Sequence, residues 1–274
     1  MDTNRSSPIG VFDSGVGGLS VVREMLQQMP AESFVYFADT AHVPYGSKEP
    51  EEIRAFASDI VSFLRDQNCK MIIIACNTTN SLAYQLLVEK FNTIPFVGVI
   101  DAGVDSALEI TRNKRIGLLA TVATVKSKAY QHKLLAKDPD IRCFSVECPR
   151  FVPFVENGIV AGEELAQTAR EYLGPIIREK ADTLILGCTH YPFLIPMIKS
   201  LTRSKLNIVD PAQETVRRAI ALLKAKGLDS SEETEPVQKY FVSGNVEDFA
   251  ETGSKLLGHK LQNVEKAFLK RCIR

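Results

Sequence analysis

The chain of 274 residues lacks several features that would assign its class at once. Its 33 basic and 33 acidic residues cancel, which argues against a polyanion as the main partner, because nucleic-acid binders usually carry a basic excess. No apolar run approaches the ~20 residues of a membrane-spanning helix. The polar residues 1–7 lack the apolar core of a signal peptide. We therefore expect a cytoplasmic protein with no membrane or nucleic-acid partner.

The chain also lacks any Cys-x-x-Cys pair, although it has six cysteines. This absence argues against a zinc knuckle and a thioredoxin-type redox motif. In a reducing compartment all six should be free thiols, and a free thiol is ordinarily a small buried apolar side chain. That interpretation applies to Cys69, Cys143, Cys148 and Cys272. We find no motif for a pyridoxal-binding lysine and no metal-ligand cluster, so we expect neither a cofactor nor a metal.

Short apolar runs alternate with helical patterns along the chain. Residues 8–12 form such a run, and residues 19–29 place apolar side chains at helical spacing. This alternation predicts an α/β fold with parallel strands covered by helices on both faces. The predicted strands are 8–12, 33–38, 71–75, 96–100, 115–120, 141–146, 183–186, 207–210 and 240–242. The predicted helices are 19–29, 51–67, 80–91, 127–135, 163–179, 193–201, 212–226 and 249–257, with a further surface helix within 260–274.

Two parts of the chain resemble each other. The segment Ile9-Gly-Val-Phe-Asp-Ser aligns with Ile116-Gly-Leu-Leu-Ala-Thr. At nearly the same offset, Ile72-Ile-Ile-Ala-Cys-Asn-Thr aligns with Leu184-Ile-Leu-Gly-Cys-Thr-His. Similar offsets indicate two copies of one α/β unit, although any chain of alternating strands and helices shows some self-similarity.

A glycine loop, Asp13-Ser-Gly-Val-Gly-Gly-Leu-Ser20, joins the first predicted strand to the first predicted helix. It does not fit a dinucleotide fingerprint, because Ser20 stands where glycine or alanine is required, and it lacks the Gly-Lys-Ser/Thr of a P-loop. The charge of Asp13 would also repel a phosphate. The loop is then either a tight turn capped by Asp13 or a site for a small ligand. In such a site Asp13 would face an ammonium while helix N-terminal amides hold a carboxylate, and an amino acid has both groups.

Cys76 and Cys188 each follow a predicted strand and precede a predicted helix. Ligands of parallel sheets bind beyond the carboxyl ends of the strands, where Asp13 also falls. A helix N-terminus favours the thiolate form of a cysteine. Two thiols facing one cavity would suit inversion at a carbon that bears hydrogen, because one can remove a proton while the other delivers one to the opposite face. His190 follows Cys188 closely enough to be its proton partner.

Five segments resemble those of glutamate racemases, within the aspartate/glutamate racemase superfamily. They are Phe12-Asp-Ser-Gly-Val-Gly-Gly-Leu-Ser20, Asp39-Thr-Ala-His-Val-Pro-Tyr-Gly46, Ala75-Cys-Asn-Thr78, Val155-Glu-Asn-Gly158 and Gly187-Cys-Thr-His-Tyr-Pro192. The resemblance implies a cofactor-independent isomerase that interconverts L- and D-glutamate and supplies D-glutamate for peptidoglycan and hence the cell wall. It also implies a homodimer and two pseudo-symmetric α/β domains, each a mainly parallel sheet flanked by helices, with the active site at their interface. The expected domains are 1–98 plus 207–274, and 99–206.

The resemblance also implies roles for single residues. Cys76 would deprotonate D-glutamate and Cys188 would deprotonate L-glutamate. Asp13 and His190 would each assist one thiol, and Asp39 and Glu156 would be further polar helpers. The expected substrate-binding residues are Asp13, Ser14, Tyr45, Gly46, Asn77, Thr78, Thr121, Thr189 and His190. His42 has no comparable neighbour in the sequence, so we expect no special role for it.

Three other functions stay open at this point. An aspartate racemase would need a smaller pocket, whose size the sequence does not reveal. A two-lobed binding protein for a small ligand would fit the fold, but it would not need a thiol at both strand ends. A redox enzyme could join Cys76 to Cys188, but sulfurs ~2 Å apart would leave no room for a substrate between them.

Overall fold

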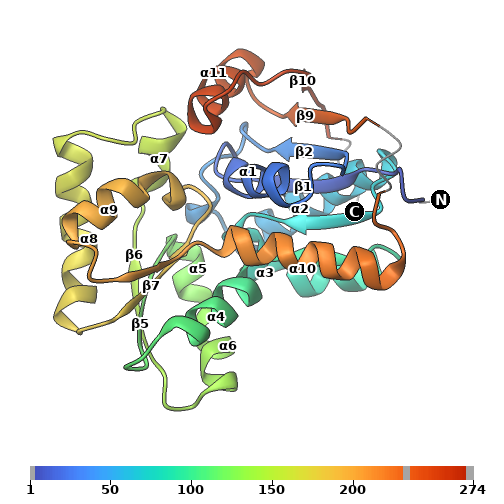
Figure 1. Cartoon of the computed structure of the whole chain (residues 1–274). Coiled ribbons are helices and arrows are strands. Elements are labelled where there is room, and N and C mark those ends of the chain that lie inside the picture. Colours follow the sequence, from blue (N-terminus) through green and yellow to red (C-terminus); the bar gives the residue numbers. More distant parts are fainter. Residues whose placement is uncertain (1–3, 231–234, 270–274) are drawn as a thin grey trace.

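The computed structural model describes residues 4–230 and 235–269, and these form two parallel sheets with helices around them (Figure 1). The first sheet has the strand order β10 (Val264–Lys266), β9 (Gln238–Val242), β2 (Phe34–Ala38), β1 (Ile9–Asp13), β3 (Met71–Ile74) and β4 (Phe96–Gly98). The second has the order β6 (Arg142–Glu147), β5 (Arg115–Ala120), β7 (Thr183–Gly187) and β8 (Asn207–Val209). This arrangement confirms the predicted α/β fold class.

The two sheets share one strand order. In the first sheet β1 has the next strand, β2, on one side and β3 followed by β4 on the other. In the second sheet β5 has β6 on one side and β7 followed by β8 on the other. The carboxyl ends of β3 and β7 therefore hold matching places. Strand β8 hydrogen-bonds to β7, so the second sheet extends beyond residue 206, where we expected the second domain to end.

Helices cover the sheets, and their ends follow local sequence signals. They are α1 (Leu19–Gln28), α2 (Pro50–Asp66), α3 (Asn77–Lys90), α4 (Val99–Ile110), α5 (Val122–Ser127), α6 (Ala129–Lys137), α7 (Phe151–Glu156), α8 (Glu163–Arg178), α9 (Ile195–Leu201), α10 (Pro211–Lys226) and α11 (Val246–Leu257), with short 3₁₀ turns at Tyr45–Ser47 and Tyr191–Leu194. Helix α10 has Asp210 as its cap and Pro211 at its start, and Gly227 ends it with φ of 63°. It packs against α1 and α4 and so joins the two halves.

The structure differs from the predicted secondary structure at several elements. The strand expected over 96–100 ends at Gly98, and Val99 begins α4, because the apolar pair after the glycine continues a buried helix rather than the strand. Helix α7 was not predicted, since Pro153 interrupts its short pattern. Within the described part of 260–274 the expected surface helix is instead β10, whose pairing with β9 outweighs local periodicity. Residues 270–274 of that prediction lie outside the described ranges.

The cysteines away from the strand ends largely behave as small apolar residues. Cys69 and Cys148 are buried, Cys143 is partly exposed, and Cys272 lies outside the described residues. None of the helices within 4–230 and 235–269 has the length and apolar character to cross a bilayer.

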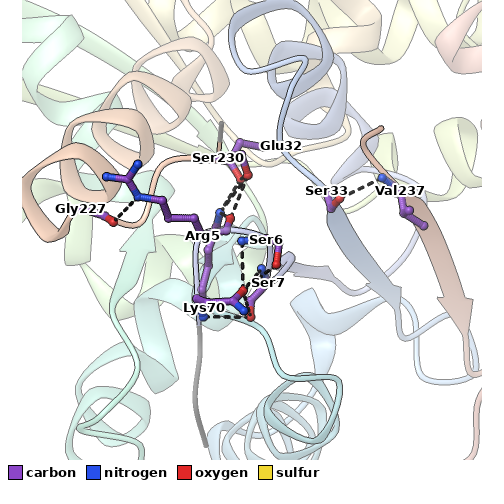
Figure 2. Close-up of polar contacts among 10 residues, drawn as sticks. Arg5, Ser6, Ser7, Glu32, Ser33, Lys70, Gly227, Ser230 and Val237 are labelled. Carbon is purple, nitrogen blue, oxygen red and sulfur yellow. Dashed lines mark hydrogen bonds and ion pairs between the residues drawn. The ribbon is translucent and has the colours of Figure 1, made fainter. Parts of the chain in front are cut away.

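A buried ion pair joins Lys70, directly before β3, to Glu32, just before β2 (Figure 2). These are the amino-terminal ends of the two strands, and Cys76 follows the opposite end of β3. Lys70 Nζ is 2.6 Å from Glu32 Oε2, and the side chain of Lys70 is fully buried. The ammonium also donates to the carbonyl oxygen of Arg5 at 2.6 Å, and the hydroxyl of Ser230 donates to Glu32 at 2.8 Å. The cluster thus binds the N-terminal segment and the loop after α10 to the sheet.

Candidate active site

The two thiols predicted to act together occupy equivalent positions. Cys76 follows β3 and forms the N-cap of α3, while Cys188 directly follows β7. Each is only 5% exposed, and both are free thiols. They reach the same cavity from different sheets, because β3 and β7 hold matching places in their sheets.

This cavity is small. Its wall consists of Ser14, Tyr45, Gly46, Cys76, Asn77, Thr78, Thr121, Val152, Cys188, Thr189 and His190. Every residue that we expected to bind substrate lies in the wall except Asp13, which is fully buried directly behind it. Val152 was missed, because a valine in an unpredicted helix gives no sequence signal. The remaining wall is mostly polar, which suits a small charged ligand.

A histidine and a carboxylate support Cys188. Nδ1 of His190 is 3.5 Å from Sγ of Cys188, and Nε2 is 2.6 Å from Oε1 of Glu156. The same oxygen of Glu156 accepts the backbone N–H of Val16 at 3.0 Å. Burial alone would lower the pKa of His190, but the negative charges of Cys188 and Glu156 outweigh it and raise that pKa well above its usual value. The contacts therefore favour a protonated imidazole beside the sulfur of Cys188.

Cys76 has different surroundings. Its sulfur accepts the backbone N–H of Thr79 at 3.5 Å, at the start of α3. Burial, with a further contribution from the charge of Asp13, raises the pKa of Cys76 to about 12. Asp13 itself accepts hydrogen bonds from Thr189 at 3.0 Å and from the N–H of Gly15 at 3.1 Å, so it acts on Cys76 through its charge. Cys76 is therefore a protonated thiol near neutral pH.

Hydroxyl and amide side chains join the two halves around the cavity. Oγ1 of Thr78 in α3 is 2.9 Å from Oγ1 of Thr121, the N-cap of α5. The hydroxyl of Tyr130 in α6 donates to Oδ1 of Asn77 at 2.7 Å. Gly46 approaches Thr121 so closely that an added Cβ would lie 2.7 Å from the threonine Cβ. Such contacts leave little room for water inside.

Asp39 lies behind the cavity wall rather than in it. Its buried carboxylate accepts the hydroxyl of Tyr45 at 2.5 Å and that of Ser243 at 2.6 Å. His42 Nδ1 is 2.8 Å from the same carboxylate, a neighbour that we did not predict for it. Three members of this cluster lie in the predicted motif of residues 39–46, but nothing in the sequence indicated Ser243, which is 204 residues away from Asp39 in the chain.

The site residues within the described ranges do not gather into a metal-binding group. Across 4–230 and 235–269, no set of three or more His, Cys, Asp or Glu side chains has a geometry that could hold a metal ion.

Comparisons with known proteins decide the family. The family model described as Asp/Glu/Hydantoin racemase matches residues 9–219. The chain belongs to this family. A glutamate racemase of Microcystis aeruginosa is 42% identical to it over 269 residues, covering 98% of this chain and 94% of the relative. The chain is thus an enzyme, an amino-acid racemase of the isomerase class, as the motifs predicted.

Solved structures support the same assignment. The structure of glutamate racemase from Francisella tularensis in complex with D-glutamate is 34% identical, has a TM-score of 0.90, and is matched over 96% of this chain and 98% of its own. The RacE1 isoform of Bacillus anthracis is 32% identical with a TM-score of 0.91, matched over 99% of this chain and 100% of its own. These likenesses agree with the two-sheet architecture.

Proposed function

We propose that the protein interconverts L- and D-glutamate by a cofactor-independent reaction in which Cys76 and Cys188 act as opposed acid and base. The observation that carries the proposal is the pair of free thiols that reach one small polar cavity from equivalent strand ends. Glutamate as the substrate is supported by the names of the relatives and by the D-glutamate bound in the Francisella structure.

In the direction from L- to D-glutamate, the Cys188 thiolate removes the α-proton. The C–H bond breaks, an S–H bond forms on Cys188, and the electron pair stays on the α-carbon. Cys76 then gives its thiol proton to the opposite face of that carbon and becomes the thiolate. The reverse reaction begins at Cys76 and restores the first state, so protons and charge balance without a further reactant.

Stabilising the carbanion is the main chemical difficulty, because an α-proton is far less acidic than a thiol, whose ordinary pKa is about 8.5. Preorganised donors in a site that excludes water can supply that stabilisation. Asp13 is suited to the substrate ammonium, although Thr189 stands between it and the cavity. The turn at Tyr45 and Gly46 is suited to the distal carboxylate, and the hydroxyls of Thr78 and Thr189 complete the polar wall.

The proposed biological role is the supply of D-glutamate for peptidoglycan in the cytoplasm, by a homodimeric enzyme. Sedimentation of the purified protein tests the dimer directly. Both thiols are free and line the cavity together, which supports acid–base chemistry over the alternative of a redox pair.

Circular dichroism of L- and D-glutamate solutions tests the activity. Purified protein with no added cofactor should bring either solution to the racemate, while Cys76→Ala and Cys188→Ala should each lose about 1,000-fold or more, as expected for removal of a general acid or base. Cys143→Ala, whose thiol lies outside the cavity, is the matched control and should keep full activity. Conversion of aspartate but not glutamate, or near-normal activity of either cavity variant, would refute the proposal.

A further inference from the structure

The carboxylate of Asp39 accepts hydrogen bonds from three side chains in two separate segments. Oδ2 accepts the hydroxyl of Tyr45, and Oδ1 accepts that of Ser243, which lies just after β9. Nδ1 of His42 lies 2.8 Å from Oδ1 and 3.0 Å from Oδ2. Asp39 is fully buried, and a buried charge is stable only when hydrogen bonds satisfy it. Each donor therefore helps to fix the orientation of this carboxylate.

Tyr45 connects the carboxylate to the reacting thiol. Its ring is 2% exposed and packs in one apolar cluster with Cys76 and Ile53. Its backbone begins the turn that brings Gly46 against Thr121 and into the cavity wall. A tyrosine ring can rotate about its side-chain bonds, and the hydrogen bond to Asp39 holds its outer end. The placement of this part of the wall therefore depends on Asp39.

His42 and Ser243 lie on the outer side of Asp39. Both line an open surface groove along α2, and neither reaches the cavity of the thiols. The side chain of His42 is 37% exposed, and its ring stacks on Phe56 at 4.2 Å between centroids. Phe56 in turn lies 5.9 Å from the ring of Tyr45. The cluster thus extends from the surface to the cavity wall on the Cys76 side.

We infer that His42 and Ser243 are positioning residues for racemisation, acting through Asp39 and Tyr45 on the Cys76 half of the site. This inference rests on the proposed function. His42 fixes the carboxylate by donating from Nδ1, and the carboxylate holds Tyr45 and its turn against Cys76. The Cys188–His190–Glu156 group has no contact with this cluster among the described hydrogen bonds, so its proton transfer should be unaffected.

Two substitutions separate the hydrogen bond of His42 from its stacking. His42→Phe keeps a ring on Phe56 but removes the donor. His42→Asn loses the ring but places an amide N–H where Nδ1 was. We expect His42→Phe to lower kcat/KM about 10- to 100-fold, the order expected for a small misplacement in an active site, and His42→Asn to stay within about threefold of wild type. Ser243→Ala should resemble His42→Phe with a smaller loss.

Isotope effects show which half of the reaction is affected. With glutamate deuterated at the α-carbon, His42→Phe should raise the isotope effect on kcat/KM for D-glutamate, because Cys76 then breaks the C–D bond in the slower step. The isotope effect for L-glutamate should fall. A merely structural defect would lower the amount of active enzyme and leave both isotope effects unchanged.

A double variant tests whether the residues act as one unit. Since coupled residues are not additive, His42→Phe combined with Tyr45→Phe should lose no more than Tyr45→Phe alone. Three results would each overturn the inference: equal losses in His42→Phe and His42→Asn, unchanged isotope effects, or full activity of His42→Phe. In each case racemisation by the wild-type enzyme would still support the proposed function. An inactive wild type would reject the proposed function and the inference with it.

Discussion

The two thiols occupy equivalent places in equivalent sheets, yet their neighbours differ. Cys188 has an imidazole 3.5 Å from its sulfur, and a carboxylate supports that imidazole at 2.6 Å. Cys76 has a backbone N–H at 3.5 Å and the negative charge of Asp13, which together with burial raises its pKa to about 12. The fold repeats the position of the thiol, but it does not repeat the groups that surround the sulfur.

This difference suits a two-base racemase in one respect. A productive enzyme must hold one thiolate and one thiol at the same time, and two identical surroundings would not select between the two arrangements. Here the imidazole of His190 lies beside Cys188, while burial and the charge of Asp13 raise the pKa of Cys76. In the proposed reaction, the state with a thiolate at Cys188 and a thiol at Cys76 accepts L-glutamate. In the proposed reaction, the opposite state, needed for D-glutamate, requires Cys76 to ionise, and the ammonium of the substrate would offset the charge of Asp13.

After loss of either thiol, replacing the imidazole of His190 should have the largest effect. His190→Asn removes the group that can hold a proton beside Cys188 while keeping a polar side chain of similar reach. We expect kcat/KM to fall about 100- to 1,000-fold, within the range for loss of a proton-transfer partner. The fall must be equal in both directions because the equilibrium constant is one. Steady-state kinetics with each enantiomer measures it, and a loss below about threefold would remove His190 from the mechanism.

The isotope effect distinguishes His190→Asn from a general defect. Deuterated L-glutamate should show the larger isotope effect, since the weakened step is the one at Cys188. His42→Phe should show the larger isotope effect with deuterated D-glutamate. If both variants showed the larger isotope effect with the same enantiomer, the groups around Cys76 and those around Cys188 would not act on separate steps.

Removing the carboxylate of Glu156 should have a smaller effect on kcat/KM, and that effect should depend on pH. Glu156 raises the pKa of His190, so Glu156→Gln should lower that pKa. The imidazolium then loses its proton at a lower pH, and the alkaline limb of kcat/KM should move to lower pH. Glutamine can still accept the N–H of Val16, which limits structural change. An alkaline limb that stays in place or moves upward would contradict the assigned role.

The buried ion pair of Lys70 and Glu32, at the amino-terminal ends of the strands, should affect the stability of the fold and leave the rate of racemisation unchanged. Lys70→Met leaves Glu32 buried without its cation, which should lower the free energy of unfolding by about 3–5 kcal/mol in urea denaturation. kcat/KM should stay within about twofold of wild type. A second substitution, Glu32→Leu, should recover part of the lost stability, since it removes the unpaired charge. A large loss of activity in the folded Lys70→Met protein would show that this ion pair affects the site at the opposite ends of the strands.

Much of the fold was predictable, because buried strands of parallel sheets are marked by short apolar runs such as Met71–Ile74. The places of Cys76 and Cys188 followed from those strands and from the rule that sites lie at strand ends. Local periodicity failed where tertiary pairing decides the structure, as at Val264–Lys266, and where an apolar run changes from strand to helix, as after Gly98.

The polar connections of the site were harder to predict. His190 lies near Cys188 in sequence, so its partnership could be expected, but the contact of Glu156 with His190 joins residues 34 positions apart. The cluster of Asp39 combines a nearby histidine with a serine from the far end of the chain. Only the order of strands in the first sheet, which places β9 beside β2, brings these residues together.

Deuterium incorporation in D₂O tests the central claim most directly. Purified enzyme is given L-glutamate, and the α-positions of both enantiomers are followed at low conversion by proton NMR and chiral separation. Two opposed thiols predict that newly formed D-glutamate carries deuterium while the remaining L-glutamate keeps its proton, with the converse result from D-glutamate. Equal deuterium in both enantiomers from the start would indicate a single base that exchanges with solvent and would contradict the two-thiol mechanism.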